Sequence, residues 1–209
     1  MELPNENELF GAYLNKAVHE IGLLGAGIKK CKKCKSGRRR GPLGGAGFPL
    51  ADLFLLKAQV SEPELDQGVA FAGPAAEILY KAFEKLDLNA SHVYGTNALK
   101  CRTEEGEIGE SEMKSCAPYL RAEIEICQPR VILAMGPLSL LVLKAADKNL
   151  AQAEYGPGQV MKMRPDLQLV LTCDLDASQM EEGSKRRFWQ DLQSAKSIMD
   201  REMEREENC

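Results

Sequence analysis

The sequence lacks the features that would place it in a membrane or outside the cell. Among its 209 residues, no apolar run approaches the roughly 18 needed to span a bilayer. Its first residues are acidic and polar and do not resemble a secretory signal peptide. We therefore expect a soluble, cytoplasmic protein that binds no membrane and is a monomer.

Histidine is also scarce: the chain has His19 and His92 and no other. A mechanism that needs histidine as an acid, base or hydrogen-bond donor therefore has two candidates. Cysteine is more abundant, at seven residues. In a chain without a secretory signal, these thiols are expected to be free, catalytic or metal-bound rather than paired in disulfides.

The net charge is small, but it is unevenly distributed. The chain has 27 basic and 31 acidic side chains, a formal charge of -4, which argues against a globally basic nucleic-acid binder. Eight of the cations lie within residues 29–40, where there is no acid. This basic arm is either a solvated loop, a set of cations attracted to anionic thiolates, or a phosphate-contacting patch. The third interpretation assigns nucleic-acid contacts to Lys32, Lys33, Lys35, Arg38, Arg39 and Arg40.

Short apolar runs alternate with stretches of helical periodicity. Strands are predicted over 53–58, 93–96, 130–135 and 168–173. Helices are predicted over 7–24, 75–86, 111–126, 137–146 and 185–203. The alternation predicts an α/β fold with three αβα layers and a central, mainly parallel four-stranded sheet.

We expect one domain, over residues 29–200. A helical extension over 1–28 precedes it, and a charged tail over 201–209 follows. Ligands of such sheets bind beyond the carboxyl ends of the strands. Chemistry is therefore sought in the loops that follow the four predicted strands.

Four cysteines form two pairs that could hold a metal. Cys31 and Cys34 are a CxxC pair, while Cys101 follows a predicted strand and Cys116 lies near the start of a predicted helix. Four thiolates can hold tetrahedral zinc or an iron–sulfur cluster, and spacing alone does not separate the two. A redox-active CxxC and four unrelated free thiols are the remaining alternatives.

Several segments together resemble a known family. They are CKKC at 31–34, QGVAFAGPAAEIL at 67–79, VYGTNALKC at 93–101, CAPYLRAEIEICQPRVILAMG at 116–136 and GSKRRFWQDL at 183–192. Their order and spacing resemble the iron–sulfur uracil-DNA glycosylases, the family-4 branch of the uracil-DNA glycosylase superfamily. The resemblance implies a uracil-DNA glycosylase-like fold and a [4Fe–4S] cluster bound by Cys31, Cys34, Cys101 and Cys116, with zinc as the alternative metal.

The resemblance also implies a pocket for a flipped base. In the family, a Phe stacks on the base and an Asn hydrogen-bonds the pyrimidine edge, and Phe71 and Asn97 occupy those positions. Gly68 and Gly73 flank Phe71 as in the family pattern, whereas Ala70 stands where proline is usual. An aromatic face and an amide are suited to hold and read an extruded base.

The two motifs that carry catalysis in the family are missing. The family's G-E-x-P-G segment is replaced by Lys57, Ala58, Gln59, Val60 and Ser61. The histidine of the family's H-P-S-type loop is replaced by Asp174, and neither histidine of the chain lies in that loop. A carboxylate there disfavours the uracil anion that the histidine would stabilise.

Three functional hypotheses follow. The first is a repair-related iron–sulfur protein that binds DNA or a nucleobase with weak or no uracil excision. The second is an active glycosylase that hydrolyses the N-glycosidic bond of uracil or another damaged base through a relocated carboxylate, with Asp66, Asp174 and Asp176 as candidates. The third is a non-catalytic module that binds a protein partner through its acidic surface.

Overall fold

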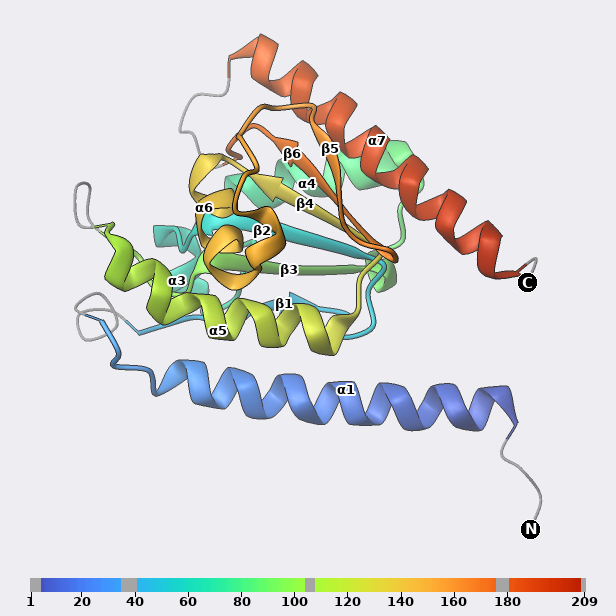
Figure 1. Cartoon of the computed structure of the whole chain (residues 1–209), viewed down its shortest axis with the longest axis horizontal. Helices are drawn as coiled ribbons and strands as arrows, with labels where there is room; N and C mark the ends of the chain where they lie inside the picture. Colours follow the sequence, from blue (N-terminus) through green and yellow to red (C-terminus); the bar gives the residue numbers. More distant parts are fainter. Residues whose placement is uncertain (1–4, 35–40, 104–107, 176–180, 208–209) are drawn as a thin grey trace.

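The strands of the chain form one six-stranded sheet with helices on both faces (Figure 1). The structure is a computed structural model that describes residues 5–34, 41–103, 108–175 and 181–207. The strand order is β1-β3-β2-β4-β6-β5. The four central strands run parallel: β3 (Val93–Leu99), β2 (Leu53–Gln59), β4 (Val131–Met135) and β6 (Leu167–Thr172). These are the four predicted strands, and the three-layer α/β class is confirmed.

The prediction of a four-stranded sheet missed two short strands at its edges. They are β1 (Ala46–Gly47), antiparallel to β3, and β5 (Val160–Arg164), antiparallel to β6. β1 has two residues and lies in a glycine-rich segment, which carries no strand pattern. β5 is largely exposed, and its lysine and arginine interrupt the apolar run that marks a buried strand.

The helices cover the sheet on both sides (Figure 1). One face packs against α5 (Glu110–Cys127) and α6 (Pro137–Ala146), and α1 (Glu6–Lys29) lies outside α5. The other face packs against α4 (Pro74–Leu86) and α7 (Glu182–Glu207). Burial on both faces explains why the central strands are apolar almost throughout.

The remaining elements are short, and two helices are longer than expected. α3 (Glu62–Gln67) follows β2, and 3-10 turns span Ala90–His92 and Lys148–Leu150. α1 extends to Lys29, and α7 continues to Glu207, so residues 201–207 of the expected tail are helical. No helix in the described ranges is long and apolar enough to cross a membrane.

Candidate functional site

Phe71 and Asn97, the two predicted base-binding residues, are brought together by a buried carboxylate. Oε1 of Glu64 accepts the backbone N–H of Phe71 at 2.6 Å and Nδ2 of Asn97 at 3.3 Å. Its Oε2 accepts the backbone N–H of Ser61 at 2.8 Å and the Ser61 hydroxyl at 3.0 Å. Glu64 thus links the end of β2, the Phe71 segment and β3.

Glu64 is not among the residues predicted from the sequence, although the chain carries a signal for it. Ser61 and Glu64 are spaced as a capping box, Ser-x-x-Glu, at the start of α3. This signal places Glu64 at a helix N-terminus. It gives no indication that the carboxylate also reaches Asn97, because that contact spans 33 residues of sequence.

Lys57 completes the network. It lies on β2 beside Asn97 of β3, and its Nζ is 3.1 Å from Oε2 of Glu64 and 5.5 Å from the centroid of the Phe71 ring. Lys57 and Glu64 are 0% exposed and Asn97 is 1% exposed. A base therefore reaches these polar groups only if side chains move.

Asn97 is not fully satisfied by this network. Its Nδ2 is used by Glu64, and its Oδ1 is buried without a hydrogen-bond partner among the described residues. An unsatisfied buried acceptor costs free energy comparable to that of a missing hydrogen bond. The amide group of Asn97, which was predicted to hydrogen-bond a base, thus donates instead to Glu64 of the buried ion pair.

Phe71 is held in an unusual backbone conformation. Its φ is +57°, in the left-handed region that few non-glycine residues adopt, and its ring packs on Gly95, where a Cβ would lie 2.6 Å from ring carbons. Gly68 (φ +68°) ends α3, and Gly73 (φ +83°) precedes α4, where a Cβ would lie 2.6 Å from Pro63. The two predicted glycines therefore shape the backbone around Phe71.

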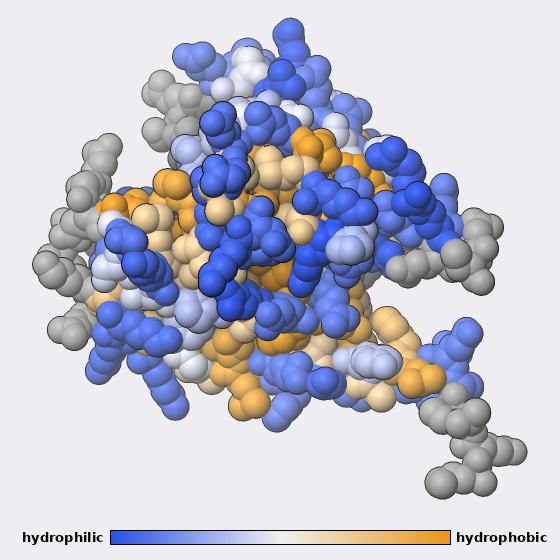
Figure 2. All heavy atoms as spheres, in the orientation of Figure 1, coloured by the Kyte–Doolittle hydropathy of each residue, from blue (hydrophilic) through white to orange (hydrophobic). Residues whose placement is uncertain are grey.

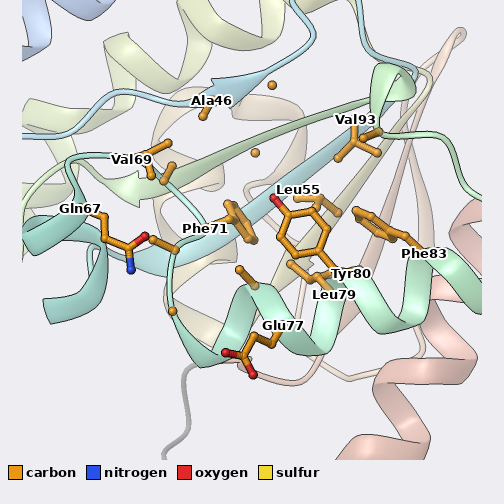
Figure 3. A pocket seen from close by; sticks show the side chains of 17 residues that line it. Ala46, Leu55, Gln67, Val69, Phe71, Glu77, Leu79, Tyr80, Phe83 and Val93 are labelled. Carbon is orange, nitrogen blue, oxygen red and sulfur yellow. The ribbon is translucent and has the colours of Figure 1, made fainter.

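An apolar cavity of about 460 Å³ lies on the α4 side of Phe71 (Figure 3). The rings of Phe71, Tyr80 and Phe83 line it together with small side chains of β1 and β3. Gln67 and Glu77 are the polar side chains of this lining. Lys57, Glu64 and Asn97 do not contribute to it, so the cavity is separate from the buried ion pair.

The residues that join β2 to α3, Val60 and Ser61, are not acidic, and the nearest carboxylates in sequence are Glu62 and the buried Glu64 of α3. Val60 is fully buried, and the carboxamide oxygen of Gln59 accepts the backbone N–H of Thr103 at 3.2 Å. Gln59 and Val60 belong to the segment that the sequence resemblance aligns with the family's catalytic motif. Val60 packs in a small buried cluster with Leu43 and Ala70, and Phe71 packs against this cluster.

The predicted catalytic carboxylates are dispersed. Asp66 is exposed on α3, and Asp174 follows β6 and packs close to Gly136, whose Cβ position would lie 3.1 Å from its side chain. Asp176 lies outside the described residues. Asp191 on α7, which the sequence did not indicate, is 2% exposed, and burial raises its pKa despite Arg187 nearby.

The four predicted metal-ligating cysteines lie near one another. The Cys101 thiol hydrogen-bonds with Cys34, and burial raises its pKa to about 12, with further contributions from Cys116, Cys34 and Cys31. Burial is also the main cause that raises the pKa of Cys116. A hydrogen bond with Cys31 raises the pKa of Tyr119 to about 12. Segments from the end of α1, the end of β3 and α5 thus meet at these thiols.

These four thiols are of the type that binds metals, but they are not positioned as ligands around a common point. Among the described residues, no three cysteine, histidine or acidic side chains are arranged to hold a metal ion. The donor set nevertheless fits zinc or an iron–sulfur cluster, since four sulfurs satisfy either one. The backbone N–H of Lys100 already donates to Sγ of Cys116 at 3.5 Å, as amides do to bound thiolates.

A second buried ion pair lies near the four cysteines, on the face of the sheet opposite to the Lys57–Glu64 pair. The ammonium of Lys100 pairs with Oε2 of Glu123, and both side chains are 1% exposed. Oε1 of Glu123 accepts the hydroxyl of Thr96 at 3.0 Å and the backbone N–H of Gly45 at 3.2 Å. This network links β3 to α5; Cys101 follows β3 and Cys116 lies on α5.

The described part of the basic arm lies beside these cysteines. Lys32 and Lys33 are exposed, and Nζ of Lys33 lies 4.5 Å from the ring centroid of Tyr119. The other four predicted nucleic-acid contacts, Lys35, Arg38, Arg39 and Arg40, lie outside the described residues.

Comparison with known proteins identifies the family of this fold. A family model described as the uracil DNA glycosylase superfamily matches residues 58–193. This match includes the end of β2, all of β3, β4 and β6, and most of the helices that cover them. It also includes Phe71, Asn97 and two of the four predicted cysteine ligands.

Three archaeal proteins named type-4 uracil-DNA glycosylase are among the similar sequences. The Sulfurisphaera tokodaii protein is 33% identical over 112 residues, 52% of this chain and 51% of the relative. The Saccharolobus solfataricus protein is 31% identical over 119 residues (56% and 55%). The Pyrobaculum aerophilum protein is 30% identical over 118 residues (56% and 60%). The matched segment thus spans little more than half the length of each relative.

Proposed function

Because the chain belongs to the uracil-DNA glycosylase superfamily, we propose that it is an iron–sulfur protein that binds DNA or a nucleobase in a repair-related role, with weak or no excision of uracil. The names of its relatives support DNA as the partner. The departures of this chain from the family pattern support the loss of excision.

The observation that carries the proposal is the buried ion pair of Lys57 and Glu64. Lys57 stands where the resembling family has the first glycine of its catalytic segment. Glycine leaves room beside Phe71 and Asn97, whereas lysine adds a four-carbon chain and an ammonium group that is fully buried there. The space between the Phe71 ring and the Lys57–Glu64 ion pair is therefore occupied by the protein's own side chains.

Electrostatics after β6 also disfavour the reaction. Uracil leaves the sugar as an anion, and one hydrogen-bond donor directed at such an anion typically contributes about 2.7–4 kcal/mol to the transition state. Asp174 stands at the donor position of the family pattern. An ionised carboxylate there offers no donor and repels the leaving group.

The cluster would be bound by Cys31, Cys34, Cys101 and Cys116. When bound, it supplies a cross-link between the end of α1, β3 and α5 and takes no part in bond cleavage. Closing the long loop between the first and second cysteine pairs favours the folded state. The high pKa of the Cys101 thiol means that ligation releases protons, so metal affinity rises with pH.

The proposal is tested by incubating the holoprotein with uracil-containing single- and double-stranded DNA, followed by alkali treatment. A type-4 uracil-DNA glycosylase is the positive control. We expect strand cleavage at least about 10³-fold slower than that of the control, because loss of one such donor alone costs about 10²–10³ in rate.

Two results would overturn the proposal in different ways. Cleavage at a rate near the control that disappears in Asp174→Ala would establish the active glycosylase with a relocated carboxylate. Absence of DNA binding even at low salt would favour the protein-interaction module instead.

A further inference from the structure

Helix α1 exposes much of the apolar surface of the molecule. Five of the nine exposed large hydrophobic side chains in the described residues lie on it: Leu9, Phe10, Tyr13, Val18 and Leu23. Figure 2 shows apolar side chains of α1 at the surface along the lower edge of the molecule. Only Ala17 and Ile28 of this helix are buried. Exposed apolar surface concentrated on one element is typical of an interaction site.

The solvent-facing side of α1 has the spacing of a coiled-coil seam. Its positions alternate by three and four residues: Glu6, Leu9, Tyr13, Lys16, Glu20, Leu23, Gly27 and, directly after the helix, Lys30. Three of these residues are large and apolar and four are charged, whereas Phe10 and Val18 lie outside the stripe. Seven of the eight are exposed, and Glu20 is partly exposed. A stripe with an average spacing of 3.5 residues faces a neighbouring helix along its whole length when two helices supercoil. The residues that pack toward α5 form a different stripe, which includes Ala17 and Ile28.

We propose that this stripe pairs with the same stripe of a second copy of the chain, as an antiparallel two-helix coiled coil. An antiparallel pair whose two-fold axis passes midway between Lys16 and Glu20 along the helix places unlike residues in each layer. The layers are Glu6 with Lys30, Leu9 with Gly27, Tyr13 with Leu23, and Lys16 with Glu20, each occurring twice through the two-fold axis. Every charged side chain of the seam meets the opposite charge, and every large apolar side chain meets an apolar residue or a glycine.

The charge pattern selects this orientation. In a parallel pair in register, each layer would join two copies of one residue, so Glu6, Lys16, Glu20 and Lys30 would each face their own charge. Like charges in contact are unfavourable, and charged seam positions set register and orientation in coiled coils. The acidic first turn and basic last turn of α1 also favour antiparallel neighbours. The proposed pairing differs from the monomer expected from the sequence.

The Lys16 and Glu20 layer allows a decisive test. Within one copy, the two side chains form an exposed ion pair at 3.9 Å, which contributes little to the stability of the monomer. In a dimer of Lys16→Glu, an acid at position 16 faces the acid Glu20 of the other copy in both central layers. In a dimer of Glu20→Lys, a base at position 20 faces the base Lys16 in both layers. A mixture of the two variants restores opposite charges in both central layers.

The experiment is sedimentation velocity of the full-length holoprotein in reducing buffer over a range of concentrations. Wild type should shift with concentration towards twice the 23.0 kDa chain mass. Each single variant should remain at the monomer mass, and their equimolar mixture should associate again. The double variant Lys16→Glu/Glu20→Lys should associate like wild type, and circular dichroism checks that all variants are folded.

Two results would overturn the pairing. A wild-type chain that remains monomeric at the highest concentration would show that this face binds no second copy. Single variants that associate as well as wild type would place a dimer contact elsewhere on the molecule. Neither result depends on DNA binding or excision, so the pairing and the proposed function can fail separately.

Discussion

Lys57 and Glu64 form an ion pair in which both side chains are fully buried, and this pair dominates the chemistry beside Phe71. A buried pair contributes little net stability compared with apolar residues of the same size, but removing one partner leaves a charge in a poorly solvated site. The main consequence of the pair is therefore that its side chains fill the space beside Phe71, and not that it stabilises the fold.

Glu64→Gln removes the carboxylate that neutralises Lys57. We expect the free energy of unfolding to fall by about 3–5 kcal/mol, the usual cost of breaking a buried ion pair. The double variant Lys57→Met/Glu64→Gln removes both charges and should recover most of this loss. Urea unfolding measures both, and a single variant as stable as wild type would contradict the buried pair.

Asp191 should make stability depend on pH. Burial raises its pKa in the folded protein, so the folded state binds this proton more tightly than the unfolded state does. The contribution of Asp191 to the free energy of unfolding is therefore greatest at low pH. It is lost as the pH rises from about 4, the usual pKa of an aspartate, past the raised pKa of the folded state. Asp191→Asn should raise the melting temperature relative to wild type by more at pH 7.5 than at pH 4.5.

The matched control for this prediction is Asp200→Asn, on the same helix but partly exposed. The carboxylate of Asp200 pairs with Lys196 at 2.6 Å, so this variant reports the loss of a partly exposed ion pair on the same helix rather than of a buried carboxyl. A constant difference between Asp191→Asn and wild type across this range would mean that the Asp191 carboxyl is not desolvated.

At the scale of elements, α1, β3 and α5 meet through their cysteines. Cys101→Ser removes a ligand of the proposed cluster, whereas Cys127→Ser changes a buried thiol of α5 near Glu123. Anaerobically purified wild type and Cys127→Ser should be brown with about four iron atoms per chain, and Cys101→Ser should lose most of its iron. Stoichiometric zinc in wild type, or full iron in Cys101→Ser, would contradict the cluster.

Some of the strands and helices could be predicted from the sequence and others could not. The four central strands and the helices between them were predictable because burial on both faces produces apolar runs and helical periodicity. The edge strands were not, because β1 and β5 are set by pairing with β3 and β6 rather than by their own composition. The same holds for the site: Phe71 and Asn97 follow from motifs, whereas their link through Glu64 depends on contacts distant in sequence.

At the scale of the whole molecule, the positive charge of the basic arm should govern DNA binding. Lys32 and Lys33 are the described, exposed members of the basic arm. Lys32→Gln/Lys33→Gln should weaken DNA binding regardless of sequence. It should also reduce the slope of log K against log salt by about 2, because each phosphate that a lysine neutralises adds about 1 to that slope.

The charge-matched control is Lys81→Gln/Lys162→Gln, which removes two exposed lysines from α4 and β5. Fluorescence anisotropy with a labelled oligonucleotide between about 50 and 200 mM salt measures both slopes. Equal effects of the two double variants would mean that the arm has no special role in binding DNA.

The central claim is that the side chain of Lys57 closes the base site, and two variants at this position test it most directly. Lys57→Gly removes both the charge and the volume, whereas Lys57→Met removes the charge and keeps most of the volume. The measurement is the affinity for a uracil-containing single strand relative to the same strand with an abasic site in place of the uracil nucleotide. Lys57→Gly should prefer the uracil strand by about tenfold, since stacking of one base contributes about 1–3 kcal/mol. Wild type and Lys57→Met should show no preference. A uracil preference already present in wild type, or absent from a folded Lys57→Gly, would contradict the account.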